Sequence, residues 1–152
     1  MNFMSNTETV KELRNLTGLP FNEIKKALDA AGGDKAGAIE VLKGRGATVA
    51  EKKSSRITGE GIVEAYVHSN KKIGVLIELL CETDFVARNP IFSELAREIA
   101  MHVAAMDPKD SKELMGQPYI REQDITVAEL ITQYIAKLGE NIKLGEFSRL
   151  QI

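Results

Sequence analysis

The spacing of apolar residues changes along this chain of 152 residues, and that change limits the folds it can adopt. In residues 1–45, apolar side chains recur every three or four positions, as on one face of an amphipathic helix. The stretch from Ile73 to Cys81 is short and almost continuously apolar, which is typical of a buried strand. Helical spacing returns after Pro90. Strands and helices in separate runs predict an α+β fold.

Residues 1–45 predict three short helices packed as a bundle. Thr7 or Thr9 is placed to cap the first helix. Asp34 is placed to cap the third helix, and the glycines at 44 and 46 are placed to end it. Residues 46–57 carry few large apolar groups, so we expect a partly helical linker between two domains there.

The remaining residues, 58–152, predict a single α+β domain. We expect a three-stranded antiparallel sheet with helices packed on one face, which leaves its other face or an edge uncovered. The helices are expected from Pro90 and from a capping box at Thr126, joined by a short loop at 107–124. The strands are expected at 61–68, 73–81 and 142–152, the last with a bulge at Gly145.

Composition and isolated motifs exclude several classes of protein. The net charge of −2 gives no reason to expect nucleic acid or an anionic membrane as partner. No apolar stretch reaches the length of a membrane span, so the cytoplasm is the expected compartment. Cys81 is the only cysteine, so an internal disulfide is ruled out and we expect a buried thiol.

The sequence contains no pattern typical of a catalytic site. Neither His68 nor His102 has neighbours that suggest a triad or a metal site, and we expect His102 to be a hydrogen-bonded core or interface histidine. Glycine-rich phosphate loops and metal-ligand spacings are also missing. We therefore expect a protein that is not an enzyme and that needs no cofactor or metal.

Residues 83–89, Thr-Asp-Phe-Val-Ala-Arg-Asn, connect the second strand to the following helix. Thr83 is placed to cap a single helical turn, and Asp84 favours the beginning of that turn. In one interpretation Phe85 fills the core. In the other it projects from the turn and binds a partner, because exposed aromatic residues on connections usually contact something. Spacing alone leaves both interpretations open.

Several segments of the chain resemble bacterial elongation factor Ts, the guanine-nucleotide exchange factor for elongation factor Tu, and they occur in the same order along the sequence. The strongest is Cys81-Glu-Thr-Asp-Phe-Val-Ala-Arg-Asn89. Val10-Lys-Glu-Leu-Arg-Asn-Leu-Thr-Gly18 and Ile135-Ala-Lys-Leu-Gly-Glu-Asn-Ile142 also match. The resemblance spans nearly the whole chain and implies that residues 1–45 form a ubiquitin-associated-type helical domain.

The resemblance also implies roles for individual residues. Phe85 would enter the nucleotide-binding domain of elongation factor Tu near its phosphate and magnesium site, with Asp84 holding it in place. The guanine nucleotide would be bound only by the partner, and the N-terminal domain would dock on the same partner domain. The implied contact residues are Thr83, Asp84, Phe85, Val86, Leu13, Gly18, Phe21 and Asn22.

The chain departs from the family pattern in two places. Leu19-Pro20-Phe21-Asn22 stands where relatives often carry a Gly-Met-Met turn, so the docking contacts there differ. Residues 107–124 are also too few for the second core subdomain and coiled coil of longer relatives. Members with one core module pair two copies, so we expect a homodimer joined through the uncovered sheet, with His102 or Tyr134 of the second copy contributing.

Three other readings compete with nucleotide exchange. An adaptor module would bind protein partners through the three-helix bundle alone, but this leaves residues 83–89 unexplained. An enzyme in the α+β domain would need a polar pocket around the two histidines. RNA binding through the basic residues near the linker lacks interleaved aromatic side chains.

Overall fold

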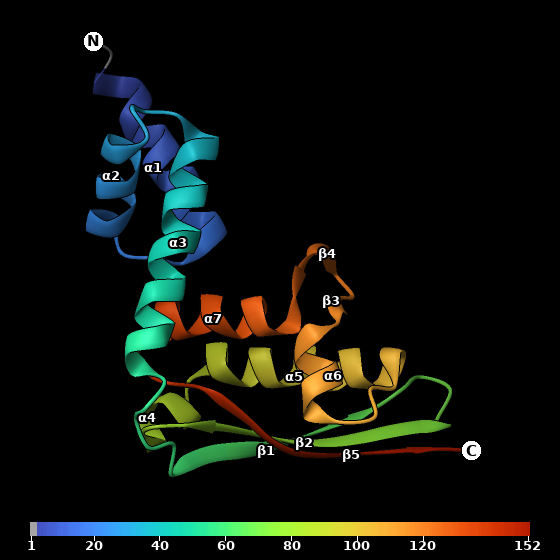
Figure 1. The fold of residues 1–152 in the computed structure, drawn as a ribbon. Helices are drawn as coiled ribbons and strands as arrows, with labels where there is room; N and C mark the ends of the chain where they lie inside the picture. Colours follow the sequence, from blue (N-terminus) through green and yellow to red (C-terminus); the bar gives the residue numbers. More distant parts are fainter. Residues whose placement is uncertain (1–2) are drawn as a thin grey trace.

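The protein consists of a helical N-terminal part above a three-stranded sheet, joined by one long helix (Figure 1). The structure is a computed structural model that describes residues 3–152, with side chains from residue 7 onward. The helices are α1 (Phe3–Thr17), α2 (Phe21–Ala30), α3 (Lys35–Lys53), α4 (Asp84–Ala87), α5 (Pro90–Met106), α6 (Ser111–Gly116) and α7 (Val127–Leu138). The strands are β1 (Glu60–Val67), β2 (Ile73–Cys81), β3 (Pro118–Tyr119), β4 (Glu122–Thr126) and β5 (Lys143–Gln151).

The main sheet has the antiparallel order β1-β2-β5, which confirms the predicted α+β class. Strand β2 is central and buries every second side chain, from Val75 to Cys81. The predicted bulge lies at Gly145, because Ile77 pairs with Phe147 while Leu79 pairs with Leu144. A Cβ at Gly145 would lie 2.8 Å from the Cβ of Glu78, so glycine is required for this close approach.

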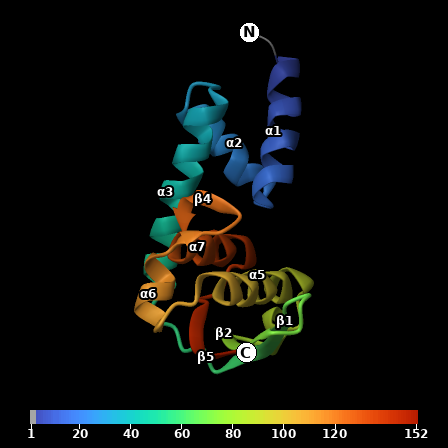
Figure 2. The same ribbon diagram turned by 90° about the vertical axis from the view of Figure 1, so that its right-hand side faces the viewer.

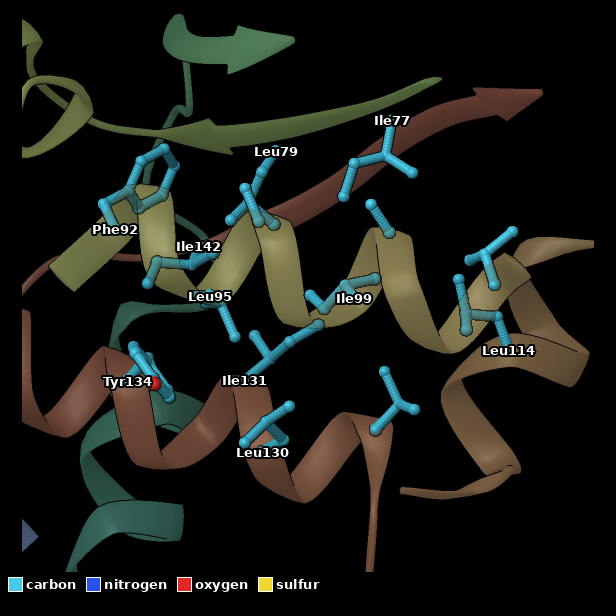
Figure 3. Close-up of a cluster of buried hydrophobic side chains, with 14 of the residues drawn as sticks. Ile77, Leu79, Phe92, Leu95, Ile99, Leu114, Leu130, Ile131, Tyr134 and Ile142 are labelled. Carbon is cyan, nitrogen blue, oxygen red and sulfur yellow. The ribbon is translucent and has the colours of Figure 1, made fainter. Parts of the chain in front are cut away.

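The core lies between the inner face of the sheet and helix α5, with α7 packed beyond α5 (Figure 3). Figures 1 and 2 show α5, α6 and α7 on the same side of the sheet, as expected. Proline begins α5, and the predicted capping box of Thr126 and Glu129 begins α7. Fully buried side chains along β2 and α5 dominate this core, among them Ile77, Leu79, Phe92, Leu95 and Ile99.

The third helix is longer than predicted. We expected it to end at the glycines at 44 and 46, but α3 continues without a break to Lys53. The reason lies in packing, because a Cβ at Gly46 would meet the Cβ of Ala136 on α7 at 3.6 Å. Gly46 therefore permits a close helix–helix contact and does not mark a helix end. Most of the expected linker is part of a helix packed on the core domain.

The segment 107–124 was expected to be a loop, and that prediction is wrong. It contains helix α6 and the small hairpin β3–β4. Asp110 caps α6 by accepting a hydrogen bond from the backbone N–H of Glu113, at 2.8 Å. Leu114 and Tyr119 then bury their side chains in the main core. The two prolines and the many charged residues of this segment concealed the local order.

The N-terminal helices share a separate apolar cluster, made of Val10, Leu13, Ile24, Ala27, Leu28, Ala38 and Leu42. We call helices α1 and α2 with the first half of α3 the N-terminal bundle. Asp34 caps α3 as predicted, by accepting from the backbone N–H of Gly37 at 2.7 Å. Helix α1 begins at Phe3, so Thr7 and Thr9 lie inside it and the predicted caps are wrong. No helix within residues 3–152 is long and apolar enough to cross a bilayer.

His102 is buried on α5 and connects that helix to the 107–124 segment. Its Nδ1 accepts a hydrogen bond from the backbone N–H of Ile120 at 3.2 Å, so the proton is on Nε2. Nε2 donates to Oε1 of Gln117 at 2.8 Å. Burial lowers the pKa of His102 below its ordinary value of 6.5, and the bond to Gln117 opposes this only in part. The histidine is therefore a neutral, hydrogen-bonded core residue, as expected.

This lowered pKa predicts a loss of stability in weak acid. The unfolded chain binds a proton at His102 near pH 6.5, whereas the folded chain resists it. The free energy of unfolding should therefore fall as the pH drops below about 6.5, by up to about 1.4 kcal/mol per unit. Urea unfolding between pH 7.5 and 5 should show a smaller slope for His102→Gln. An unchanged slope in His102→Gln would contradict this assignment.

Candidate partner-binding site

Helix α4 is a single turn at the end of β2 that presents Phe85 to solvent. Phe85 is 85% exposed, whereas the next two residues, Val86 and Ala87, are buried. Thr83 caps the turn by accepting a hydrogen bond from the backbone N–H of Val86 at 3.4 Å. The two buried side chains fix the turn on the core, so the aromatic ring is directed outward. Of the two interpretations of this segment, the structure supports the projecting one.

Asp84 lies beside the exposed ring at the start of the turn. Its carboxylate forms an ion pair with Arg88 one turn later, with 3.4 Å between Oδ2 and the guanidinium nitrogen. Both side chains are more than half exposed, so water and salt weaken the pair. Asp84 therefore adds little to the stability of the turn, and its acceptor oxygens are available at the surface.

A glutamate far along the chain fixes the base of this turn. Oε1 of Glu140 accepts backbone N–H bonds from Glu82 at 3.2 Å and from Thr83 at 3.0 Å. Its Oε2 accepts from the Thr83 hydroxyl at 2.6 Å. We call residues 82–88, with their helix α4, the α4 tip. Sequence reasoning missed this contact, and its only signal was the position of Glu140 in the segment that resembles the family.

The predicted contact residues of the N-terminal part lie in different environments. Gly18 and Asn22 are exposed around the α1–α2 turn, and Phe21 is about half exposed. Leu16, which sequence reasoning did not select, is also exposed there. Leu13 is fully buried in the bundle, so it supports this surface from below and does not face a partner. The same holds for Val86 in the α4 tip.

The outer face of the main sheet forms a second apolar surface. Side chains that alternate with the core residues emerge on this face, and four of them are between 52% and 76% exposed. No helix covers it within the part of the chain that the structure describes (Figures 1 and 2). We define the outer face by the apolar residues Val63, Ala65, Val67, Leu76, Leu80 and Leu150, which surround the polar Glu78 and Ser148.

The chemistry of the remaining polar groups is limited. Among the described residues, no group of three or more His, Cys, Asp or Glu side chains is arranged to hold a metal ion. Cys81 is buried at the end of β2, and burial is the main cause that raises its pKa to about 11. A thiol with that pKa stays protonated and is a poor nucleophile at neutral pH. The exposed apolar surfaces are thus better suited to binding than to catalysis.

The chain is similar in sequence to proteins of one known family. The family model described as elongation factor TS matches residues 82–152, which include the α4 tip and Glu140. Elongation factor Ts of Thermosipho melanesiensis is 42% identical over 194 residues, covering 98% of this chain and 99% of that protein. Elongation factor Ts of Carboxydothermus hydrogenoformans is 38% identical, covering 98% of this chain and 89% of that protein.

The chain is shorter than the relative from Thermosipho melanesiensis. The Thermosipho comparison spans 194 residues and this chain has 152, so at least 42 positions of that relative have no counterpart here. A third relative, elongation factor Ts of Rippkaea orientalis, is 42% identical, covering 92% of this chain and 75% of that protein. Identity at this level over nearly the full length shows common ancestry and a common fold. The chain belongs to the elongation factor Ts family of translation elongation factors.

Proposed function

We propose that this protein promotes the release of GDP from elongation factor Tu by inserting Phe85 beside the phosphate and magnesium site of that partner. The observation that carries the proposal is the 85% exposure of an aromatic ring on a turn whose neighbouring residues are buried. A large apolar side chain held in water in this way is available for a protein pocket. The protein itself binds no nucleotide in this proposal and makes or breaks no covalent bond.

The energetics of such an insertion are sufficient for exchange. Burial of one Phe side chain stabilises a complex by roughly 1.5–3 kcal/mol. About 1.4 kcal/mol changes an equilibrium constant tenfold, so Phe85 alone can weaken GDP by one to two orders of magnitude. The condition is that the ring lodges only when the phosphate-binding loops are displaced. The coupling is reciprocal, so a nucleotide that refills the site expels the exchange factor.

The N-terminal bundle supplies a second contact in this proposal. Leu16 and Phe21 form an exposed apolar patch at the α1–α2 turn, which is the ubiquitin-associated-type docking surface that the family resemblance implies. Phe21 replaces part of the apolar contact that a methionine turn would make, and Asn22 does not. Docking of this patch on the nucleotide-binding domain would bring the α4 tip to the same partner. An adaptor that used the bundle alone would leave the exposed Phe85 without a role.

Removal of the aromatic ring tests the exchange mechanism. Phe85→Ala should lower the stimulated rate of GDP release from elongation factor Tu by roughly 10- to 100-fold, because the energy of burying the ring is lost. Release of a fluorescent GDP analogue measures this directly. Since the ring is already in water, the thermal midpoint should stay nearly unchanged.

Ile120→Ala is the matched control, because it removes an exposed apolar side chain on the β3–β4 hairpin away from α4 (Figure 1). It should exchange normally. Normal exchange by Phe85→Ala would show that the ring is not the inserted group.

We further propose that two copies pair through the outer face. Exposed apolar side chains lie on all three strands of this face. Proteins usually remove such a surface from water by packing it against another protein surface, and a second copy of the same chain offers one. His102 and Tyr134 are buried on the helices behind the inner face, so the expectation that they reach the second copy is wrong. A dimer through this face leaves the α4 tip and the α1–α2 turn, which belong to other elements, free for elongation factor Tu.

A charge placed in the outer face tests the pairing. Leu76 lies on the central strand, and Leu76→Lys would put an unpaired ammonium group into an apolar interface. Sedimentation at micromolar concentration should show a dimer for the unaltered protein. It should show a monomer for Leu76→Lys, with a dimer dissociation constant at least about 100-fold weaker. Ile120→Lys, at an exposed position off the sheet, should remain dimeric. A monomeric unaltered protein would contradict the pairing.

A further inference from the structure

The turn after α7, residues 139–141, lies between the base of the α4 tip and the C-terminal end of α3 (Figure 1). We propose that Glu140 and Asn141 in this turn are positioning residues that fix Phe85 relative to the N-terminal bundle. The inference rests on the proposed exchange function and adds two residues that act through contacts within this chain. Neither residue stood out in the sequence except as part of a matching segment.

Glu140 holds the α4 tip from one side. Its two carboxylate oxygens accept three hydrogen bonds, all from Glu82 and Thr83. The Thr83 hydroxyl donates to Glu140 and accepts from the backbone N–H of Val86, so the carboxylate also orients the cap of α4. Bonds to a charged acceptor are stronger and shorter than neutral ones. The base of the tip is therefore bound to a residue 57 positions later in the chain.

Asn141 binds the end of α3 from the other side of the same turn. Its side-chain amide donates to the backbone oxygens of Arg56 at 2.9 Å and Ser54 at 3.4 Å. Its backbone N–H donates to Oε1 of Glu82 at 2.8 Å. Asn141 is 3% exposed, and a buried amide with these partners holds its segment in one arrangement. The two neighbouring residues thus join the α4 tip to the residues that follow α3.

A continuous helix and close helix–helix contacts connect this turn to the N-terminal bundle. Helix α3 runs unbroken from the bundle to Lys53, one residue before Ser54. It packs closely on α7 at Gly46 and Ala136, and Gly139 ends α7 with a left-handed backbone angle of φ 75°. An L-residue disfavours that angle, so the glycine directs the chain into the turn. The α1–α2 turn also lies against α7, because a Cβ at Gly18 would meet the Lys137 side chain at 3.4 Å, so the apolar patch and the exposed ring of Phe85 are both placed by contacts with α7 and the turn that follows it.

This placement matters because an exchange factor with two contact points must place both on one partner. If the α4 tip moved freely, ordering it on binding would consume part of the energy gained by inserting the ring. Loss of the Glu140 contacts should therefore act through Phe85. It should reduce nucleotide release without abolishing the fold of the core.

A double-mutant cycle on nucleotide release tests this dependence. Glu140→Ala should lower the stimulated rate of GDP release roughly tenfold in the unaltered protein. In the Phe85→Ala background it should lower that rate by less than about twofold, since no ring remains to be positioned. Glu140→Gln should retain most of the activity, because its amide oxygen still accepts from the two backbone N–H groups. Glu122→Ala, an exposed carboxylate on β4, is the matched control and should behave as unaltered protein.

Amide hydrogen exchange gives a readout that does not depend on activity. In Glu140→Ala, the amides of Val86, Ala87 and Arg88 should exchange at least about tenfold faster. The amides of Ile77 and Leu79 in the central strand should keep their protection. Asn141→Ala should add faster exchange at the residues that end α3.

The outcomes separate the two proposals. Equal loss of rate from Glu140→Ala in both backgrounds, or faster exchange throughout the sheet, would show a general structural role and overturn the positioning role. Full activity of Glu140→Ala beside an impaired Phe85→Ala would also overturn it, while leaving the exchange function intact. If Phe85→Ala exchanges normally, the insertion mechanism fails, and unchanged protection at 86–88 in Glu140→Ala would then overturn the positioning claim independently.

Discussion

An aromatic ring held in water at the end of a buried strand is the feature on which the rest of this structure depends. Exposure of Phe85 forgoes roughly 1.5–3 kcal/mol that burial of the ring would provide. The ring stays outside because Val86 and Ala87 occupy the core beneath it and because Glu140 and the Thr83 cap fix the backbone at the start of the turn. The unused burial energy becomes available when a partner offers a pocket.

The core, the outer face and the α1–α2 turn lie in three different parts of the fold. The inner face of the sheet, with α5 and α7, provides the core that anchors the α4 tip. The outer face is apolar and lies on the opposite side of the sheet from those helices. The α1–α2 turn lies at the end of the bundle that faces α7, where a Cβ added at Gly18 would lie 3.4 Å from the Lys137 side chain, so packing on the core domain sets its distance from Phe85. Binding at the outer face therefore leaves the α4 tip and the α1–α2 turn accessible.

Apolar spacing and capping residues predicted most of the core domain. The main strands, the helix that starts at Pro90 and the capping box at Thr126 follow from local patterns, because each depends on neighbours in sequence. The errors concern residues whose role depends on distant contacts. Gly46 looks like a helix end but faces Ala136, and the polar segment 107–124 hides a capped helix with a buried leucine.

The candidate site was predictable in part for the same reason. Thr83 as a cap and Phe85 as a candidate contact can be read from consecutive residues. The outward direction of the ring, the burial of Leu13 and the bonds from Glu140 to the α4 tip cannot, because they depend on packing between segments far apart in the chain.

Photocrosslinking from position 85 tests the central claim most directly. A benzophenone amino acid in place of Phe85 should form an adduct with nucleotide-free elongation factor Tu. Peptide mapping should place that adduct beside the phosphate and magnesium site of the nucleotide-binding domain, with a much lower yield when GDP is in excess. An adduct confined to another domain, or a yield that GDP does not change, would contradict insertion of Phe85 into the opened nucleotide site.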